Sequence, residues 1–175
     1  MDALVSLNDI LTDVASLPEL LRSADMLMEA LAQVAINTFT MTAVVEIPVR
    51  FAKYYLNIVF KVCQNVKVVR ETSEKALREL TEILLQCLLI DDLQRLGEKN
   101  EGASMVKLIN ASMLKLLENG EKTKTFRTLI WLLKKYKGTG DKILNLVAKC
   151  SLKLTKAMSS LIDEIRPLEL LQISQ

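Results

Sequence analysis

The sequence predicts an all-α protein, a short α-solenoid of antiparallel helical hairpins with about eight helices. Only five Gly and three Pro occur in 175 residues, and half of the chain is hydrophobic while a quarter is charged. Apolar residues recur at helical spacing over long stretches, whereas the alternation typical of strands is nearly absent. We therefore expect one domain over 1–175, with possible halves 1–90 and 103–175.

The breaks between the predicted helices favour a stack of hairpins over a closed bundle. Breaks at 65–67 and 120–122 are very short, while those at 40–47 and 94–102 are longer. This alternation is expected if each tight hairpin is one repeat of about 40 residues that a looser segment joins to the next.

The first two helices are predicted over 2–15 and 23–40. The first has a single apolar stripe formed by Leu4, Leu7 and Leu11. Ser16 and Glu19 flank Pro18 in a capping-box pattern, which predicts a short turn before the second helix.

The next two helices are predicted over 48–64 and 68–90. Pro48 suits a helix start because its missing N–H group has no partner there in any case. In 68–90 the charges have helical spacing as well, and predict two i,i+4 ion pairs, Glu71 with Lys75 and Glu74 with Arg78.

Three further helices are predicted over 103–119, 123–137 and 141–160. The mixed charges and two glycines before the first of them predict the longest loop. The glycines at 138 and 140 indicate a helix end and a hinge, because a phosphate loop would need a preceding strand and a different spacing. A last short helix is predicted to begin near Pro167.

The composition excludes several classes of function. A formal net charge of +2 is too small for a typical nucleic-acid-binding protein. The chain contains no His, which removes Ser-His and Cys-His catalysis and the His-containing zinc sites. No stretch is long and apolar enough for a membrane span, and the start of the chain lacks the cations of a signal peptide. We expect no enzyme activity, cofactor, metal, nucleic acid or membrane.

The three cysteines, Cys63, Cys87 and Cys150, lie far apart within apolar helical patterns. We therefore expect buried free thiols in a reducing, intracellular compartment. Trp131 is interpreted as a core residue, with a partner-binding anchor as the alternative. The row Lys142, Lys149, Lys153 and Lys156 is interpreted as a solvated outer face.

The start of helix 123–137 carries cations where acidic residues are usual. With Thr123 as the N-cap, Lys122, Lys124 and Arg127 crowd the first turn. The positive end of the helix macrodipole lies there, so each cation costs from a few tenths to about 1 kcal/mol. These residues are therefore candidates for a role outside their own helix.

Residues 70–174 resemble the C-terminal helical domain of the large microtubule polymerases, the family of human chTOG and fly Mini spindles. The similarity lies in the Arg70-Glu71 helix opening and in the segments SMVKLINASMLKLLENGEKTKTFRTLIWLL and NLVAKCSLKLTKAM. These are helix-packing patterns and not active-site motifs. The predicted helices before residue 70 follow the helix order of that domain less closely.

The resemblance implies a HEAT-repeat domain of the TOG type, a non-enzymatic protein-interaction domain of a cytoplasmic, cytoskeletal protein. It implies docking to adaptors at centrosomes, spindle poles or microtubules, with a transforming acidic coiled-coil protein or another spindle adaptor as the partner. We expect a monomer. Two alternatives stay open: direct binding of tubulin, and a structural role in which the domain packs against the rest of a longer chain.

Direct binding of tubulin would require a particular residue in one turn of the chain. N-terminal TOG domains of this family bind tubulin through turns inside their hairpins and present a Trp there. The corresponding turn of this chain, ASLPELLRSAD at 15–25, contains no Trp. This difference favours adaptor binding.

If the helices pair as hairpins, their turns bring six cations to one edge of the solenoid: Lys67, Arg70, Lys122, Lys124, Arg127 and Arg166. This edge is either a surface for an acidic partner or an ordinary solvated rim. Because the cations at 122–127 oppose the macrodipole, replacing them with Glu is expected to leave thermal stability equal or slightly higher and to weaken partner binding.

Overall fold

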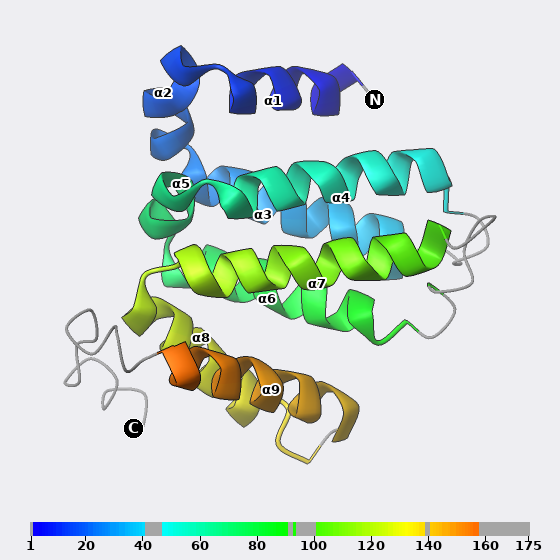
Figure 1. Cartoon of the computed structure of the whole chain (residues 1–175), viewed down its shortest axis with the longest axis vertical. Coiled ribbons are helices and arrows are strands. Elements are labelled where there is room, and N and C mark those ends of the chain that lie inside the picture. Colours follow the sequence, from blue (N-terminus) through cyan, green and yellow to red (C-terminus); the bar gives the residue numbers. More distant parts are fainter. Residues whose placement is uncertain (1, 41–46, 91–92, 94–100, 139–140, 158–175) are drawn as a thin grey trace.

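The computed structural model describes residues 2–40, 47–90, 93, 101–138 and 141–157, and these contain nine α-helices and no strand (Figure 1). The predicted all-α fold class is confirmed. The helices are α1 (Asp2–Thr12), α2 (Leu17–Arg22), α3 (Ala24–Ala35), α4 (Val49–Gln64), α5 (Val66–Glu71), α6 (Glu74–Leu88), α7 (Glu101–Asn119), α8 (Lys122–Lys135) and α9 (Asp141–Ala157). A 3₁₀ turn, Val14–Ser16, and a π-helical turn, Ile36–Thr40, complete the list.

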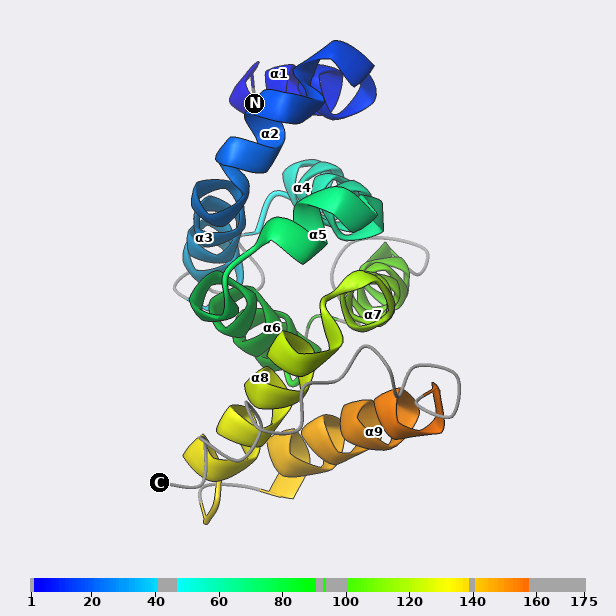
Figure 2. The ribbon, with the colours of Figure 1, turned by 90° about the vertical axis from the view of Figure 1, so that its left-hand side faces the viewer.

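The longer helices form two layers. One layer holds α1, α4, α7 and α9, and the other holds α3, α6 and α8, as the two perpendicular views show (Figures 1 and 2). Within the layers α4 packs against α7, and α6 packs against both α3 and α8. Helices α1 and α9 lie at opposite ends of the array, so the fold is an open stack and not a closed bundle (Figure 1).

Helix α6 is the centre of the core. It contacts α3, α7, α8 and α9, so that its apolar side chains are buried in several directions. Leu80, Leu84 and Leu85 are completely buried. Beside it, the hydroxyl of Tyr55 donates to the carbonyl oxygen of Leu31 at 2.5 Å and ties α4 to α3. A helix that is apolar on more than one side is typical of an inner position in a solenoid.

The predicted helix 68–90 is wrong in one respect, because it is two helices. The chain breaks at Thr72, whose Oγ1 donates to the carbonyl oxygen of Val68 at 2.9 Å. Ser73 then caps α6, since its Oγ accepts a hydrogen bond from the N–H of Ala76 at 3.3 Å. A local side-chain bond here outweighs the continuous apolar pattern.

The break also separates the two predicted ion pairs. Glu74 and Arg78 lie on the same helix and form their pair as predicted. Glu71 and Lys75 lie on either side of the break, and Lys75 pairs instead with Glu29 of α3 at 2.7 Å.

The predicted capping box at Ser16 is wrong. Ser16 has helical backbone angles (φ −79°, ψ −8°) and makes no side-chain cap bond. Its hydroxyl donates to Oδ2 of Asp13 at 2.7 Å, and this hydrogen bond is the main cause of the lowered pKa of Asp13. An N-cap needs an extended backbone, which the 3₁₀ turn does not provide.

Two other predictions fall largely outside the described residues. These are most of the predicted loop before residue 103 and the predicted short helix near Pro167. Helix α7 begins at Glu101, two residues earlier than predicted.

Gly120, between α7 and α8, is required for a close approach. A Cβ atom at this position would lie 2.5 Å from Oγ1 of the buried Thr125 and 2.9 Å from the carbonyl oxygen of Leu116. We expect Gly120→Ala to lower the free energy of unfolding by about 1–3 kcal/mol, because neighbouring backbone must move. Urea-induced unfolding measures this. Glu118→Ala, an exposed change in the same hairpin, should alter stability by less than about 0.5 kcal/mol. Equal stability of the two variants would contradict the packing.

Candidate protein-interaction surfaces

The predicted basic edge lies where α5, α7 and α8 meet. Helix α8 begins at Lys122, and its N-cap is Glu121 and not Thr123 as the sequence predicted. The Glu121 carboxylate accepts hydrogen bonds from the N–H groups of Thr123 at 3.1 Å and Lys124 at 2.8 Å. A carboxylate at this position stabilises the helix start, so the expected conflict with the macrodipole is reduced.

Lys122 is buried, with only 3% of its surface exposed. Its ammonium group donates to the carbonyl oxygens of Glu118 at 2.6 Å and Leu117 at 3.3 Å. These carbonyls belong to the last turn of α7. Carbonyl oxygens in this turn have no N–H partner within the helix, and the negative end of the helix macrodipole lies there. Lys122 therefore caps the preceding helix.

Lys124 and Asn119 act in the same way on other helices. The Lys124 ammonium donates to the carbonyl oxygens of Arg70 at 3.1 Å and Thr72 at 2.9 Å, at the end of α5. The Asn119 amide donates to the carbonyl oxygen of Cys63 at 2.8 Å, at the end of α4. The turn between α7 and α8 thus fastens three helix ends together.

Arg127 is also engaged within the protein. Its Nε lies 2.7 Å from Oε2 of Glu74, and both side chains are only about a quarter exposed. Glu74 pairs with Arg78 as well, and the Arg78 guanidinium lies 5.2 Å from the centre of the Trp131 ring. The ammonium of Lys135 lies 4.8 Å from the same ring. Trp131 packs against the core, as predicted, beneath two cations.

The remaining predicted edge residues separate into two groups. Lys67 and Arg70 are exposed on α5, while Arg166 lies outside the described residues. Lys122 is buried, and Lys124 and Arg127 are only partly exposed because they bind groups of other helices, so the exposed part of the edge is the α5 segment. We now expect replacement of these three cations with Glu to lower stability, contrary to the prediction from the sequence. The replacements would remove two caps and an ion pair. The sequence held one signal for the cap on α7, because a lysine two residues after the helix end at Gly120 can reach the last carbonyl groups of that helix.

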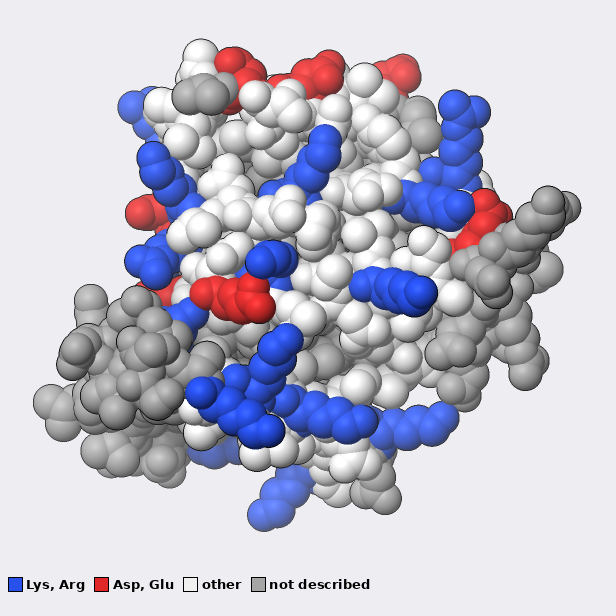
Figure 3. Space-filling view, viewed as in Figure 1, with Lys and Arg blue, Asp and Glu red and all other residues white. Residues whose placement is uncertain are grey.

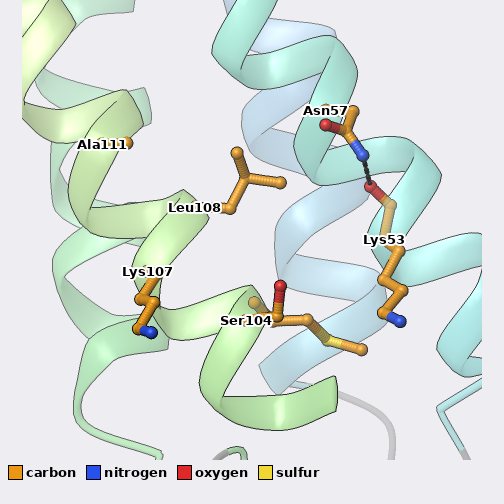
Figure 4. A pocket seen from close by; sticks show the side chains of 7 residues that line it. Lys53, Asn57, Ser104, Lys107, Leu108 and Ala111 are labelled. Atoms are coloured by element: carbon orange, nitrogen blue, oxygen red, sulfur yellow. Dashed lines mark hydrogen bonds between the residues drawn. The ribbon is translucent and has the colours of Figure 1, made fainter. Parts of the chain in front are cut away.

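A second surface is the hollow between α4 and α7 (Figure 4). It encloses about 510 Å³ and has Lys53, Asn57, Ser104 and Lys107 among its lining residues. Lys53 pairs with Glu101 at 2.6 Å, and the Asn57 amide donates to the Lys53 carbonyl oxygen at 2.9 Å. Among the described residues that line the hollow there is no carboxylate and no thiol, so these residues offer no acid–base pair and no metal ligands of those kinds.

The layer of α4, α7 and α9 is rich in cations. Figure 3 shows Lys and Arg side chains spread over this face and gathered at its α9 end. Within the described residues, four exposed lysines on α7 and α9 pair with no carboxylate: Lys107, Lys149, Lys153 and Lys156. The predicted exposure of the lysine row on α9 is confirmed.

The opposite layer, α3, α6 and α8, carries both signs of charge, and its carboxylates lie beside cations. A hollow between α3 and α6 has Glu29, Glu79 and Glu82 among its lining residues. Glu29 pairs with Lys75, and Glu82 pairs with Lys135 at 2.6 Å. The three glutamates of this hollow are therefore paired with lysines, whereas the four lysines on α7 and α9 pair with no carboxylate in the described residues.

The three cysteines are free thiols, as predicted, but the predicted burial holds for Cys63 and Cys87 and is wrong for Cys150. Burial raises the pKa of Cys63 and of Cys87 to about 12, so both stay protonated at neutral pH and are poor nucleophiles. Cys150 is half-buried; burial raises its pKa, and nearby Lys153 opposes this change.

The described part of the chain shows neither a metal-ligand cluster nor a membrane-spanning helix. No group of three or more potential His, Cys, Asp or Glu ligands gathers there around a possible metal site. In the same residues, no helix combines the length and the hydropathy that crossing a membrane requires.

Comparison with known proteins identifies two plant relatives. The chain is 33% identical to Protein MOR1 of Arabidopsis thaliana in an alignment 173 residues long. The alignment covers 90% of this chain and 8% of MOR1. It is 32% identical to Protein MOR1 of Oryza sativa subsp. japonica in an alignment 164 residues long. This alignment covers 85% of this chain and 8% of that protein. No family model and no solved structure matches the chain. The chain thus spans less than a tenth of the length of these relatives.

Proposed function

Because this chain is homologous to a segment of the MOR1 proteins, we propose that it is a non-enzymatic interaction domain of a microtubule-associated polymerase. We take MOR1 as a plant member of the polymerase family that the sequence resembles. In this proposal the domain docks a longer protein to adaptors at centrosomes, spindle poles or microtubules. The homology over most of the chain is the observation that carries the proposal.

The architecture supports an interaction role. Stacked helices expose long, continuous surfaces, which solenoid proteins use to bind other proteins. The described residues that line the hollow between α4 and α7 offer lysine, amide and hydroxyl groups without a carboxylate or thiol beside them. The described part of the chain therefore resembles a binding module more than an enzyme.

An adaptor fits the site better than tubulin. The turn that would correspond to a tubulin-binding Trp is occupied by α2, whose sequence is LPELLR. The single Trp of the chain, Trp131, lies on α8 beneath Arg78 and Lys135. The exposed Lys67 and Arg70 suit an acidic adaptor such as a transforming acidic coiled-coil protein.

The double variant Lys67→Glu/Arg70→Glu tests this proposal. We expect slower association with a purified acidic coiled-coil adaptor, because exposed charges at an interface act mainly by steering the partner. The wild-type association rate should fall as salt rises, since the Debye length shrinks to about 8 Å at physiological ionic strength and about 3 Å at 1 M. Surface plasmon resonance over a salt series measures both effects.

The matched control is Arg50→Glu/Lys137→Glu, which makes an equal charge change at two exposed residues on α4 and after α8. If only the α5 variant slows binding, Lys67 and Arg70 form the adaptor site. Wild-type kinetics for the α5 variant would remove this edge from the site. Binding of tubulin without binding of the adaptor would replace the proposal by its tubulin alternative.

A further inference from the structure

A narrow groove lies between α7 and α9, with α6 beneath it. It encloses about 160 Å³, the volume of about five water molecules, which is room for an anchoring apolar side chain. Its floor consists of six apolar residues: Leu85, Leu88, Met113, Leu114, Leu117 and Leu146. Two lysines of α9, Lys149 and Lys153, also line it.

The charge around the groove is one-sided. Lys149 and Lys153 are exposed, and neither pairs with a carboxylate within the described residues. Lys156 extends the same row by one turn. An apolar floor beside unpaired cations matches a ligand that is apolar on one side and acidic on the other.

We propose that this groove binds an acidic amphipathic helix of a protein partner. One apolar side chain of the helix enters the groove as an anchor, and carboxylates of the helix face Lys149 and Lys153. This surface is distinct from Lys67 and Arg70, and the inference goes beyond the adaptor site proposed above.

Cys150 provides a reporter inside the groove. It is among the lining residues and is half-buried, whereas Cys63 and Cys87 are buried, with 0% and 1% exposed. A maleimide reagent should therefore modify Cys150 in the folded protein, while the other two thiols serve as internal controls for folding. A helix seated in the groove covers Cys150 and slows this reaction.

The test uses a synthetic helical peptide of about 18 residues with leucines on one face and glutamates on the other. The complete 175-residue chain is titrated with this peptide by fluorescence anisotropy, and the alkylation rate of Cys150 is followed by mass spectrometry. A peptide with lysines in place of the glutamates and a shuffled peptide of the same composition are the ligand controls. We expect binding of the acidic amphipathic peptide alone, with protection of Cys150.

Lys149→Glu/Lys153→Glu should weaken binding of this peptide about tenfold, while Arg50→Glu/Lys137→Glu, an equal charge change at two exposed residues outside both proposed surfaces, should leave it unchanged. Circular dichroism confirms that each variant is folded. The proposal is overturned if both variants bind alike, if the peptide binds without protecting Cys150, or if Cys150 is already protected in the free protein. Because adaptor binding is measured with another ligand and depends on other residues, each proposal can fail while the other holds.

Discussion

Lys122→Glu is expected to lower the free energy of unfolding by about 3 kcal/mol or more. The side chain at this position is almost fully buried and faces two carbonyl oxygens at the end of α7. A carboxylate there would lack donors, meet the negative end of the helix macrodipole and lie away from water. Urea-induced unfolding with linear extrapolation measures the loss.

Two controls separate the causes of this effect. Lys122→Met keeps most of the volume and loses the cap without placing a carboxylate there, so we expect a smaller loss of about 1–2 kcal/mol. Lys67→Glu makes the same charge change on an exposed residue and should alter stability by less than about 0.5 kcal/mol. Wild-type stability of Lys122→Glu would show that the ammonium does not cap α7.

Leu84→Ala is expected to destabilise the protein by about 2–5 kcal/mol. Leu84 is completely buried on α6, the helix that contacts α3, α7, α8 and α9. Truncation removes packing at the centre of both layers and leaves a cavity that rigid neighbouring helices fill only in part. Chemical denaturation is again the measurement.

Leu152→Ala is the matched control for this prediction. Leu152 is 62% exposed on α9, so the same truncation there should change stability by less than about 0.5 kcal/mol. If the two variants lose similar amounts, α6 is not the centre of the core and the two-layer arrangement is wrong.

The positions of the helices were predictable because burial against a second layer imposes a helical period on the apolar residues. Helix boundaries were less predictable, because single side-chain hydrogen bonds decide them. Ser73 caps α6 and Ser16 caps nothing, although both residues precede acidic segments. What distinguishes them is backbone conformation, which is extended at Ser73 and helical at Ser16.

The roles of the cations could be predicted only in part. Their unusual position at the start of α8 was visible in the sequence, and so was the lysine row on α9. Their partners were not, because Lys124 bonds to the carbonyl oxygen of Arg70, 54 residues away, and Arg127 pairs with Glu74. Patterns within one helix carry no information on such contacts. The groove beside α9 also depends on how three helices meet, so it required the structure.

Direct binding of purified partners tests the central claim, that this chain is an adaptor-docking domain of a microtubule polymerase. The folded chain is titrated by isothermal calorimetry with an acidic coiled-coil adaptor segment and, separately, with tubulin dimers. We predict that the adaptor segment binds, that the affinity falls as salt increases, and that tubulin gives no heat of binding. Binding of tubulin without the adaptor segment, or binding of neither by a folded chain, would contradict the claim.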